Sequence, residues 1–425
     1  MRRRLFPVAI VLCGTAFGQA PLNLTLPEAE KLAIQNNPAL TAQQFNARAA
    51  AQGPVEVRSA LAPTVFGSVT GVGADSGSRL AAGALNNPVV YSRIGTGITV
   101  TQLITDFGRT RDLTQAATYH AQAEDQVTQT VDANIVLETD RAYFAVLRAQ
   151  SVLTVANETV RARQLVSDQV SELARNRLKS DLDVSFANVN LAQAKIQLAE
   201  AESDVQAAKA QLATALGTPA QQDFLLTEPS MPAAVEATAD NYIQQATQNR
   251  PELAQLRLQV NAAERTVQAE RALSYPTVSA IGTAGAVPAG ESAIPGTYGA
   301  AGVNVNIPIF NGGLFKARRT EAEMRLAAAQ KNVEDLQNRI DRDVRTAWLD
   351  ARTAYQQVDL TAQLMDQARR ALDLAQGRYD LGLGSIVELS QAQLNYTSAQ
   401  IANAGAKFDF EARNSFLQYQ SGNLR

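Results

Sequence analysis

The sequence predicts a mixed fold, in which very long antiparallel coiled-coil α-helices adjoin a small number of transmembrane β-strands. Three observations support this prediction. Similar motifs recur about 200 residues apart, long stretches contain no helix-breaking residue, and short segments between them alternate apolar and polar residues. The first observation indicates a tandem duplication. The second is typical of long helices, and the third of β-strands.

The composition excludes several classes of function. The 425 residues include 38 basic and 41 acidic residues, a net charge of −3, which indicates no basic surface for nucleic acid. One His and one Cys leave almost nothing for a His/Cys metal site or a disulfide framework. No Gly-rich phosphate loop followed by Lys is present, and no triad can be assembled around the single His. We therefore expect no enzymatic activity, no cofactor and no bound metal.

Residues 1–20 are expected to be a secretory signal peptide. Arg2 to Arg4 precede an apolar stretch from Leu5 to Ala16, which is too short to span a bilayer. Small residues suitable for cleavage end at Gly18 and at Ala20. A leucine precedes Cys13, whereas a lipoprotein signal has a small residue there. The mature chain is thus expected to be exported and to contain no cysteine.

Paired motifs divide the rest of the chain into two repeats. Pro38 corresponds to Pro251, 213 residues later, and Tyr143 corresponds to Trp348, 205 residues later. We expect Tyr143 and Trp348 to pack in helix interfaces. Each repeat begins with a helix, which Pro54 interrupts in the first repeat. The predicted first repeat, linker and second repeat are residues 21–217, 218–239 and 240–425.

Four long helices are predicted at residues 108–176, 181–216, 313–380 and 385–420. No glycine occurs from Arg109 to Leu216, and no proline follows Pro308. Apolar residues recur every seven positions in the second helix and impose left-handed coiled-coil packing. One such series is Val184, Leu191, Leu198, Val205 and Leu212, and a second is Ala187, Ala194, Ala201, Ala208 and Ala215. The alanine series allows two helix backbones to approach closely.

Each repeat also contains one predicted β-hairpin, at about residues 64–103 and 277–310. In the second hairpin, Val303, Val305, Ile307 and Ile309 alternate with Asn304, Asn306 and Pro308. Alternation over about ten residues is typical of a membrane strand with one face toward lipid and the other toward a polar lumen. We therefore expect Asn304 and Asn306 to line the lumen of a barrel.

Four strands cannot close a barrel, and an open sheet edge cannot lie in lipid. The smallest membrane barrels have about eight strands. Two copies of the chain would supply eight strands and three copies would supply twelve, so a membrane-inserted chain must oligomerise. The alternative is a soluble four-stranded sheet that caps a helical bundle.

Ordered motifs along the chain resemble those of the TolC-like outer membrane efflux proteins. The resemblance covers about Leu24 to Gly422, and its matching segments are Asn36-Asn37-Pro38, Asn249-Arg250-Pro251-Glu252-Leu253, Ser274-Tyr275-Pro276, Ile309-Phe310-Asn311-Gly312-Gly313 and Tyr379-Asp380-Leu381-Gly382-Leu383. It implies a homotrimer with a 12-stranded barrel in outer membrane lipid and a helical barrel in the periplasm. An equatorial region would contain Gly217 to Asn249.

The same resemblance implies a function. Such a chain would be the passive exit duct of a tripartite efflux or type I secretion system. A periplasmic adaptor (membrane fusion) protein and an inner-membrane efflux pump or ABC transporter would dock at the far tip of the helices and open it. The alternative function is that of a soluble periplasmic coiled-coil structural or adaptor protein.

Candidate site residues follow from the resemblance at the two helix-to-helix junctions. Asp183 and Tyr379 resemble a pair that holds neighbouring coils closed, and Glu388 and Gln391 resemble positions that narrow the pore. Crowded carboxylates would repel one another and attract cations. Two positions depart from the pattern, because Gly384 replaces a basic residue and Gln391 replaces an acid. The basic residue could be substituted by Arg175, Arg177 or Lys179.

Adaptor contact is expected at Leu381, Gly382 and Leu383, with Arg177-Leu178-Lys179 as the first-repeat counterpart. The alternative is that all these residues are ordinary helix-turn residues with solvated charges. Elsewhere, the run from Arg339 to Arg345 is expected to be a solvated or intersubunit ion-pair face. His120 stands alone on a polar helix, which argues against a metal site there.

Overall fold

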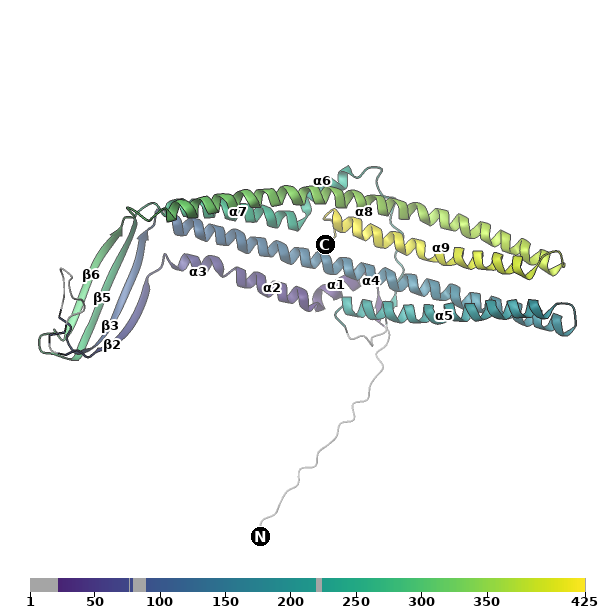
Figure 1. Cartoon of the computed structure of the whole chain (residues 1–425), viewed down its shortest axis with the longest axis horizontal. Helices are drawn as coiled ribbons and strands as arrows, with labels where there is room; N and C mark the ends of the chain where they lie inside the picture. Colours follow the sequence, from purple (N-terminus) through teal and green to yellow (C-terminus); the bar gives the residue numbers. More distant parts are fainter. Residues whose placement is uncertain (1–21, 76, 79–88, 219–223, 425) are drawn as a thin grey trace, which may run out of the picture.

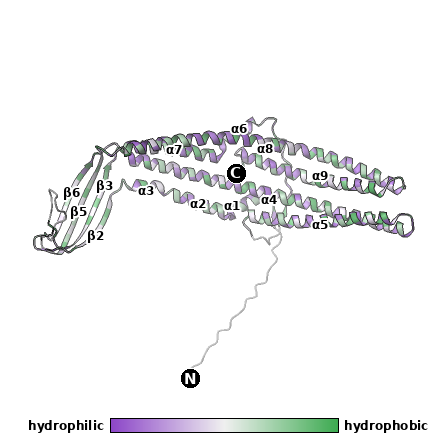
Figure 2. Ribbon diagram, viewed as in Figure 1, coloured by the Kyte–Doolittle hydropathy of each residue, from purple (hydrophilic) through white to green (hydrophobic). Residues whose placement is uncertain are grey.

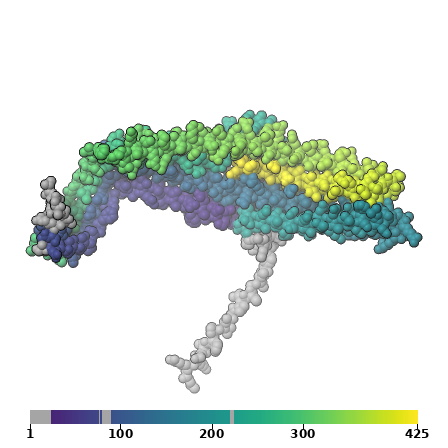
Figure 3. All heavy atoms as spheres, in the orientation of Figure 1, coloured from purple at the N-terminus to yellow at the C-terminus, as the bar shows by residue number. Residues whose placement is uncertain are grey.

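The computed structural model describes residues 22–75, 77–78, 89–218 and 224–424. The predicted signal peptide, residues 1–20, lies outside the described residues. Figure 1 shows a molecule with a β-sheet at one end, long helices in the middle and two helical turns at the far end. The helical part forms one elongated, gently curved body (Figure 3).

Two helices of 67 residues run along this body, namely α4 (Arg109–Arg175) and α8 (Leu314–Asp380). Each is on the order of 100 Å long at ~1.5 Å per residue. Two helices of 35 residues, α5 (Asp181–Ala215) and α9 (Ile386–Gln420), return from the far end and pack along α4 and α8 respectively. The four helices begin and end within a few residues of the predicted limits.

The heptad positions of α5 and α9 form the seams of these helix pairs. The buried members in α5 are Ala187, Leu191, Ala194, Ala201, Val205, Ala208, Leu212 and Ala215. The equivalent positions of α9, 205 residues later, bury Leu389, Ala399, Ala406, Phe410 and Leu417. Hydrophilic and hydrophobic residues are mixed along the long helices (Figure 2). Among the described residues, no helix combines the length and the apolar character that crossing a membrane requires.

Short helices cover the parts of α4 and α8 that lie nearer the sheet. On α4 these are α1 (Leu26–Asn36), α2 (Pro38–Ala50) and α3 (Gly53–Ser59), and beside α8 they are α6 (Asp240–Asn249) and α7 (Pro251–Ala272). Pro54 lies in the first turn of α3, so the predicted interruption falls between α2 and α3.

Prolines also cause the breaks between α1 and α2 and between α6 and α7. The residues before them, Asn37 and Arg250, have ψ angles of 118° and 121°, because a following proline disfavours the helical conformation. Two glycines contact these breaks with positive φ angles of 64° at Gly217 and 74° at Gly422. A Cβ at Gly217 would lie 2.9 Å from the Asn36 carbonyl oxygen. The ends of α5 and α9 therefore meet the proline breaks of their own repeats at very close range.

The segment between the repeats is held by hydrogen bonds to two aromatic side chains. Strands β1 (Leu22–Leu24) and β4 (Phe224–Leu226) form a parallel pair beside α4. The buried Tyr143 hydroxyl donates to the carbonyl oxygens of Leu24 at 2.9 Å and Thr227 at 2.6 Å. Trp348 Nε1 donates to the Glu236 carbonyl oxygen at 2.9 Å. Both residues thus fix the linker backbone as well as packing on helices.

The sheet at the end of the molecule has the order β2-β3-β5-β6, and all its pairs are antiparallel. Its strands are β2 (Thr64–Val72), β3 (Arg93–Thr105), β5 (Thr277–Gly290) and β6 (Thr297–Asn306). Strand β6 ends at Asn306 rather than at the predicted residue 310. Asn306 pairs with Thr277, and the ladder stops there because Pro308 and Pro276 have no N–H to donate. The strands β2 and β6 leave both edges of the sheet open in one copy of the chain.

Two carboxyl groups are buried near the level of the linker. Asp140 on α4 is 1% exposed, Glu411 on α9 is 2% exposed, and neither Asp140 Oδ1 nor the Glu411 oxygens have a hydrogen-bond partner among the described residues. Burial raises the pKa of Asp140 to about 8, with Ser415 opposing the shift and Glu30 adding to it. Burial likewise raises the pKa of Glu411 to about 7. Both groups therefore bind a proton at a higher pH in the folded chain than in the unfolded chain.

We predict that these carboxyl groups make the fold less stable as pH rises. Their folded pKa values exceed the unfolded values of about 4, so the folded chain binds more protons between about pH 4 and 8. The stabilisation is present at about pH 4 and is lost progressively through pH 8. Asp140→Asn should increase stability at pH 8.5 by about 1–3 kcal/mol and change it little at about pH 4. Thermal unfolding at both pH values would measure this, with the exposed Asp125→Asn as control. Equal pH dependence in the two variants would contradict the prediction.

Candidate functional site

The two helical turns at the far end have the same backbone geometry. Leu178 N–H donates to the Leu173 carbonyl at 2.8 Å, and Leu383 N–H donates to the Arg378 carbonyl at 2.8 Å. This six-to-one hydrogen bond closes a helix end through one residue in the left-handed region. That residue is Arg177 (φ 59°) in the first turn and Gly382 (φ 71°) in the second. The counterpart of Leu381-Gly382-Leu383 is therefore Asn176-Arg177-Leu178, one residue earlier than predicted, because the turn geometry aligns Arg177 with Gly382.

Both turns present large apolar side chains to solvent. Leu178 is 68% exposed, Leu381 is 76% exposed and Leu383 is 69% exposed. Leu182 and Val387, in the first turns of the following helices, are also exposed. Clustered apolar side chains that protrude at the end of a helical body are typical of a contact surface for another protein. The predicted tip residues thus share one surface.

The two turns differ in how their acidic residues are used. Asp183 accepts from the backbone N–H of Ser180 at 3.0 Å and from its hydroxyl at 2.8 Å, and so forms a capping box at the start of α5. At the equivalent position of α9, Glu388 forms an ion pair with Arg378 at 3.1 Å. The Arg378–Glu388 pair joins the end of α8 to the start of α9 and was not predicted from the sequence.

Tyr379 links the two turns. Its ring is buried with apolar residues from α4, α5, α8 and α9 in one cluster, which includes Val170, Ala187 and Leu389. Lys179 Nζ lies 3.5 Å from the centroid of this ring and donates to the Tyr379 carbonyl oxygen at 3.2 Å. The ammonium therefore makes a cation–π contact and also lies at the negative end of the α8 dipole.

The Tyr379 hydroxyl has no hydrogen-bond partner among the described residues. Burial, with added repulsion from Asp183 and Asp380, raises its pKa to about 12. Asp183 therefore influences Tyr379 through space, and no hydrogen bond joins the two side chains within one copy of the chain. Gln391, another of the four predicted gate residues, forms a hydrogen bond within its own helix. Its Nε2 donates to Asn395 Oδ1 at 2.9 Å.

Gly384 stands where the family pattern has a basic residue. The three basic residues that could take its role make different contacts. Arg175 pairs with Glu172 on its own helix at 2.5 Å, Arg177 occupies the turn, and Lys179 contacts Tyr379. Only the Lys179 contact joins the two halves of the chain. Its position in the repeat could have indicated this, since Lys179 lies 205 residues before Gly384.

The strand register separates a polar from an apolar face of the sheet. Asn304 lies opposite Ser279, and Asn306 lies opposite Thr277. Two threonines of the same face, Thr99 and Thr283, approach within 3.4 Å through their hydroxyl oxygens. The opposite face carries Val65, Ile98, Val100, Val303 and Val305, all of them exposed in one copy of the chain. Asn304 and Asn306 therefore lie on the more polar face of the sheet, which also carries the exposed Phe66 and Ile281.

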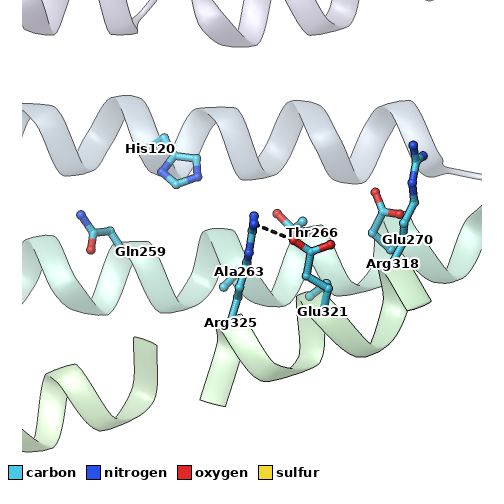
Figure 4. Close-up of a pocket in the computed structure, with 9 residues that line it drawn as sticks. His120, Gln259, Ala263, Thr266, Glu270, Arg318, Glu321 and Arg325 are labelled. Carbon is cyan, nitrogen blue, oxygen red and sulfur yellow. Dashed lines mark ion pairs between the residues drawn. The ribbon is translucent and has the colours of Figure 1, made fainter. Parts of the chain in front are cut away.

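His120 lines a cavity of about 380 Å³ between α4, α7 and α8. Figure 4 shows Glu270, Arg318, Glu321 and Arg325 around the same cavity, and Glu321 pairs with Arg325 at 2.6 Å. The described residues contain no group of three His, Cys, Asp or Glu side chains that could hold a metal ion.

The basic run on α8 makes ion pairs close to the helix surface. Arg339 pairs with Asp335, Arg345 pairs with Asp341, and Arg342 pairs with Asp343, all at 3.1 Å or less. These exposed pairs within one helix match a solvated ion-pair face.

Long helix pairs that end in a small antiparallel sheet and a two-turn tip define a TolC-like outer membrane channel fold. The chain belongs to the outer membrane efflux protein family, whose sequence profile matches residues 30–218 and 242–415. Members of this family are efflux channels rather than enzymes.

Particular relatives and structures support the same assignment. The outer membrane efflux protein BepC of Brucella suis is 27% identical over 357 residues, which cover 81% of this chain and 74% of BepC. The outer membrane protein TolC of Escherichia coli is 24% identical over 366 residues, which cover 81% of this chain and 71% of TolC. The solved structure of CusC superposes with a TM-score of 0.82 at 18% identity and covers 93% of this chain and 92% of CusC. The solved structure of VceC from Vibrio cholerae superposes with a TM-score of 0.80 at 19% identity and covers 93% of this chain and 96% of VceC.

We predict opposite effects for alanine at two glycines near the tip. Gly382 has a positive φ angle, so Gly382→Ala should destabilise its turn by about 1–2 kcal/mol. Gly377 lies inside α8, where an added Cβ meets no atom within 4 Å, so Gly377→Ala should stabilise the helix by up to about 1 kcal/mol. Hydrogen exchange of residues 374–390 would measure both effects. Equal protection in the two variants would show that the turn does not require glycine.

Proposed function

We propose that the chain forms the homotrimeric outer membrane exit duct of a tripartite efflux or type I secretion system. One observation supports this proposal above the others, namely the four-stranded sheet with open edges and two uncovered faces at the end of helices on the order of 100 Å long. A sheet of this kind has no stable place in water, since its valine- and isoleucine-rich face is exposed.

Closure of the sheet requires more than one copy, and the resemblance to the TolC-like proteins favours three. Strand β6 of one copy can pair with β2 of the next, and three copies give a closed barrel of twelve strands, within the range of membrane barrels. In such a barrel the polar face with Asn304 and Asn306 lines the lumen, and the apolar face contacts outer membrane lipid. The helices then extend into the periplasm as a second, helical barrel, and the two repeats of each copy contribute equivalent helix pairs.

The tip leucines are the proposed contact for a periplasmic adaptor protein. Leu178, Leu381 and Leu383 lie at the end of the body farthest from the sheet, where an inner-membrane efflux pump or ABC transporter and its adaptor would reach them. The polar composition of the lumen strands does not specify a substrate, so the duct is proposed as a common exit for what the pump delivers.

Membrane extraction tests this function. We expect the full chain to be found in the outer membrane fraction, to require detergent and to migrate as a trimer that dissociates on heating. Cysteines at facing positions of β2 and β6 should cross-link only between copies, whereas a cysteine pair within α4 should give no cross-linked oligomer. A soluble monomer in the periplasmic fraction would contradict the duct and favour a soluble coiled-coil structural or adaptor protein.

The proposed gate is the contact between Lys179 and Tyr379. It connects the turn after α4 to the end of α8, so separation of the two hairpins must break it. Asp183 and Glu388 support the gate indirectly by fixing the starts of α5 and α9, and Gln391 lies one turn further along α9. A cation–π contact contributes about 0.5–2 kcal/mol, which corresponds to roughly 2- to 30-fold in the closed-to-open ratio for each copy.

Single-channel conductance in planar bilayers tests the gate. Lys179→Met should increase the open fraction, because it removes the ammonium and keeps an apolar stem. Tyr379→Phe should leave conductance unchanged, since the hydroxyl has no partner, whereas Tyr379→Leu should increase it. The exposed Lys195→Met is the control for loss of a positive charge. If only Asp183→Ala combined with Tyr379→Phe opened the channel, closure would depend on the carboxylate and hydroxyl instead.

A further inference from the structure

A buried arginine without an acidic partner lies between the two helical hairpins. Arg163 on α4 is 9% exposed, and its guanidinium forms neither an ion pair nor a hydrogen bond with any residue that the structure describes. Burial lowers its pKa to about 10. A guanidinium stays charged at neutral pH even so, and a buried charge without a counter-charge is costly. No residue that the structure describes supplies a counter-charge for Arg163.

Two buried polar side chains on the facing helix also have no partner. Gln393 is 7% exposed and Thr397 is 6% exposed, and they lie one turn apart on α9. Neither side chain forms a hydrogen bond within the described residues. One turn to either side of Arg163 on α4, the polar groups are satisfied: Thr159 donates to the Val155 carbonyl and Ser167 donates to Asn188, both at 2.8 Å. Arg163, Gln393 and Thr397 thus share one level of the interface, separate from the level of Asp140 and Glu411 near the linker.

This level coincides with two adjoining cavities. Arg163 and Thr397 line both of them, one of about 170 Å³ toward α5 and one of about 270 Å³ that Gln393 also lines. The further neutral polar lining consists of amide and hydroxyl groups, namely Thr159, Asn190, Gln193, Gln197, Ser390, Gln391, Tyr396 and Gln400. Glu158 lies at the rim of the larger cavity, but it is exposed and makes no ion pair with Arg163. Apart from the exposed Glu158, the lining therefore offers one positive charge and several neutral donors.

We propose that Arg163, Gln393 and Thr397 form a binding site for a small monovalent anion, either a halide or a small carboxylate such as formate. A single guanidinium without an acidic partner is neutralised by one monovalent anion. The planar guanidinium can donate two parallel hydrogen bonds to a carboxylate. Amide and hydroxyl donors can complete the coordination of such an ion. Taken singly, each cavity is smaller than a site for a drug-sized ligand, which has about 300–1,000 Å³. A bound anion would connect α4 with α9, and this site does not depend on the proposed function of the duct.

Thermal unfolding of the full, detergent-purified chain tests the site with sodium formate and sodium bromide as probes. Ionic strength is held constant by exchanging each probe for an equal concentration of MES, a bulky sulfonate. We expect the unfolding temperature to rise and saturate as either probe replaces MES. Arg163→Met should abolish this rise, and Arg163→Lys should retain a weaker one. The exposed Arg161→Met, on the same helix, should respond like the unaltered chain.

Crystals grown in sodium bromide give the second measurement, with an anomalous scattering peak expected beside the Arg163 guanidinium. A saturable rise that persists in Arg163→Met would overturn the proposal. A bromide peak without any saturable rise would mean an adventitious ion only and would also overturn it. If neither probe stabilises the chain and Arg163→Met instead weakens the oligomer, the counter-charge is a carboxylate of a second copy, and the anion site is rejected.

Discussion

Helices of 67 residues depend here on side-by-side packing along their whole length, because local propensity alone stabilises long helices only weakly. Helix α4 receives this packing in two sections, from α5 near the tip and from α1, α2, α3 and α7 nearer the sheet, and α9 of the other hairpin also packs on it. The sections meet where Gly217 approaches the Asn36 carbonyl. Gly422 and the break at Arg250 form the same junction beside α8. The proline breaks and the glycines together let two short helices act as one continuous partner.

Local patterns in the sequence were sufficient to predict these elements. Runs without Pro or Gly predicted the long helices, and the heptads of alanine predicted the seams between them. Alternation of apolar and polar residues predicted the strands. The end of β6 was misplaced, because alternation continues through Ile307 and Ile309 while Pro308 and Pro276 stop the backbone pairing. Contacts between distant segments were not predictable in this way. The Arg378–Glu388 contact depends on the exact fold of one turn, and single-residue spacing carries no signal for it. The repeat offset aligns Lys179 with Gly384, but it does not identify Tyr379 as the partner of Lys179.

The interface between the hairpins is less apolar than the alanine seams suggest. Asp140, Arg163, Gln393, Thr397 and Glu411 are all at least nine-tenths buried. Buried polar groups reduce stability unless they are satisfied, but they can fix the register of helices that could otherwise slide past each other. A uniform alanine stripe gives little resistance to such sliding. Polar groups at two separate levels, near the linker and nearer the tip, are well placed to define one register.

The equal lengths of α4 and α8, and of α5 and α9, have a consequence for how this architecture can change during evolution. Both turns lie at the same distance from the sheet because each repeat has the same two lengths, 67 and 35 residues. An insertion of one heptad in α4 alone would displace one turn by about 10 Å and leave the other behind. The distance from the sheet to the tip can therefore increase only when α4, α5, α8 and α9 all receive insertions of matching length. Selection can change this distance only in steps that all four helices share.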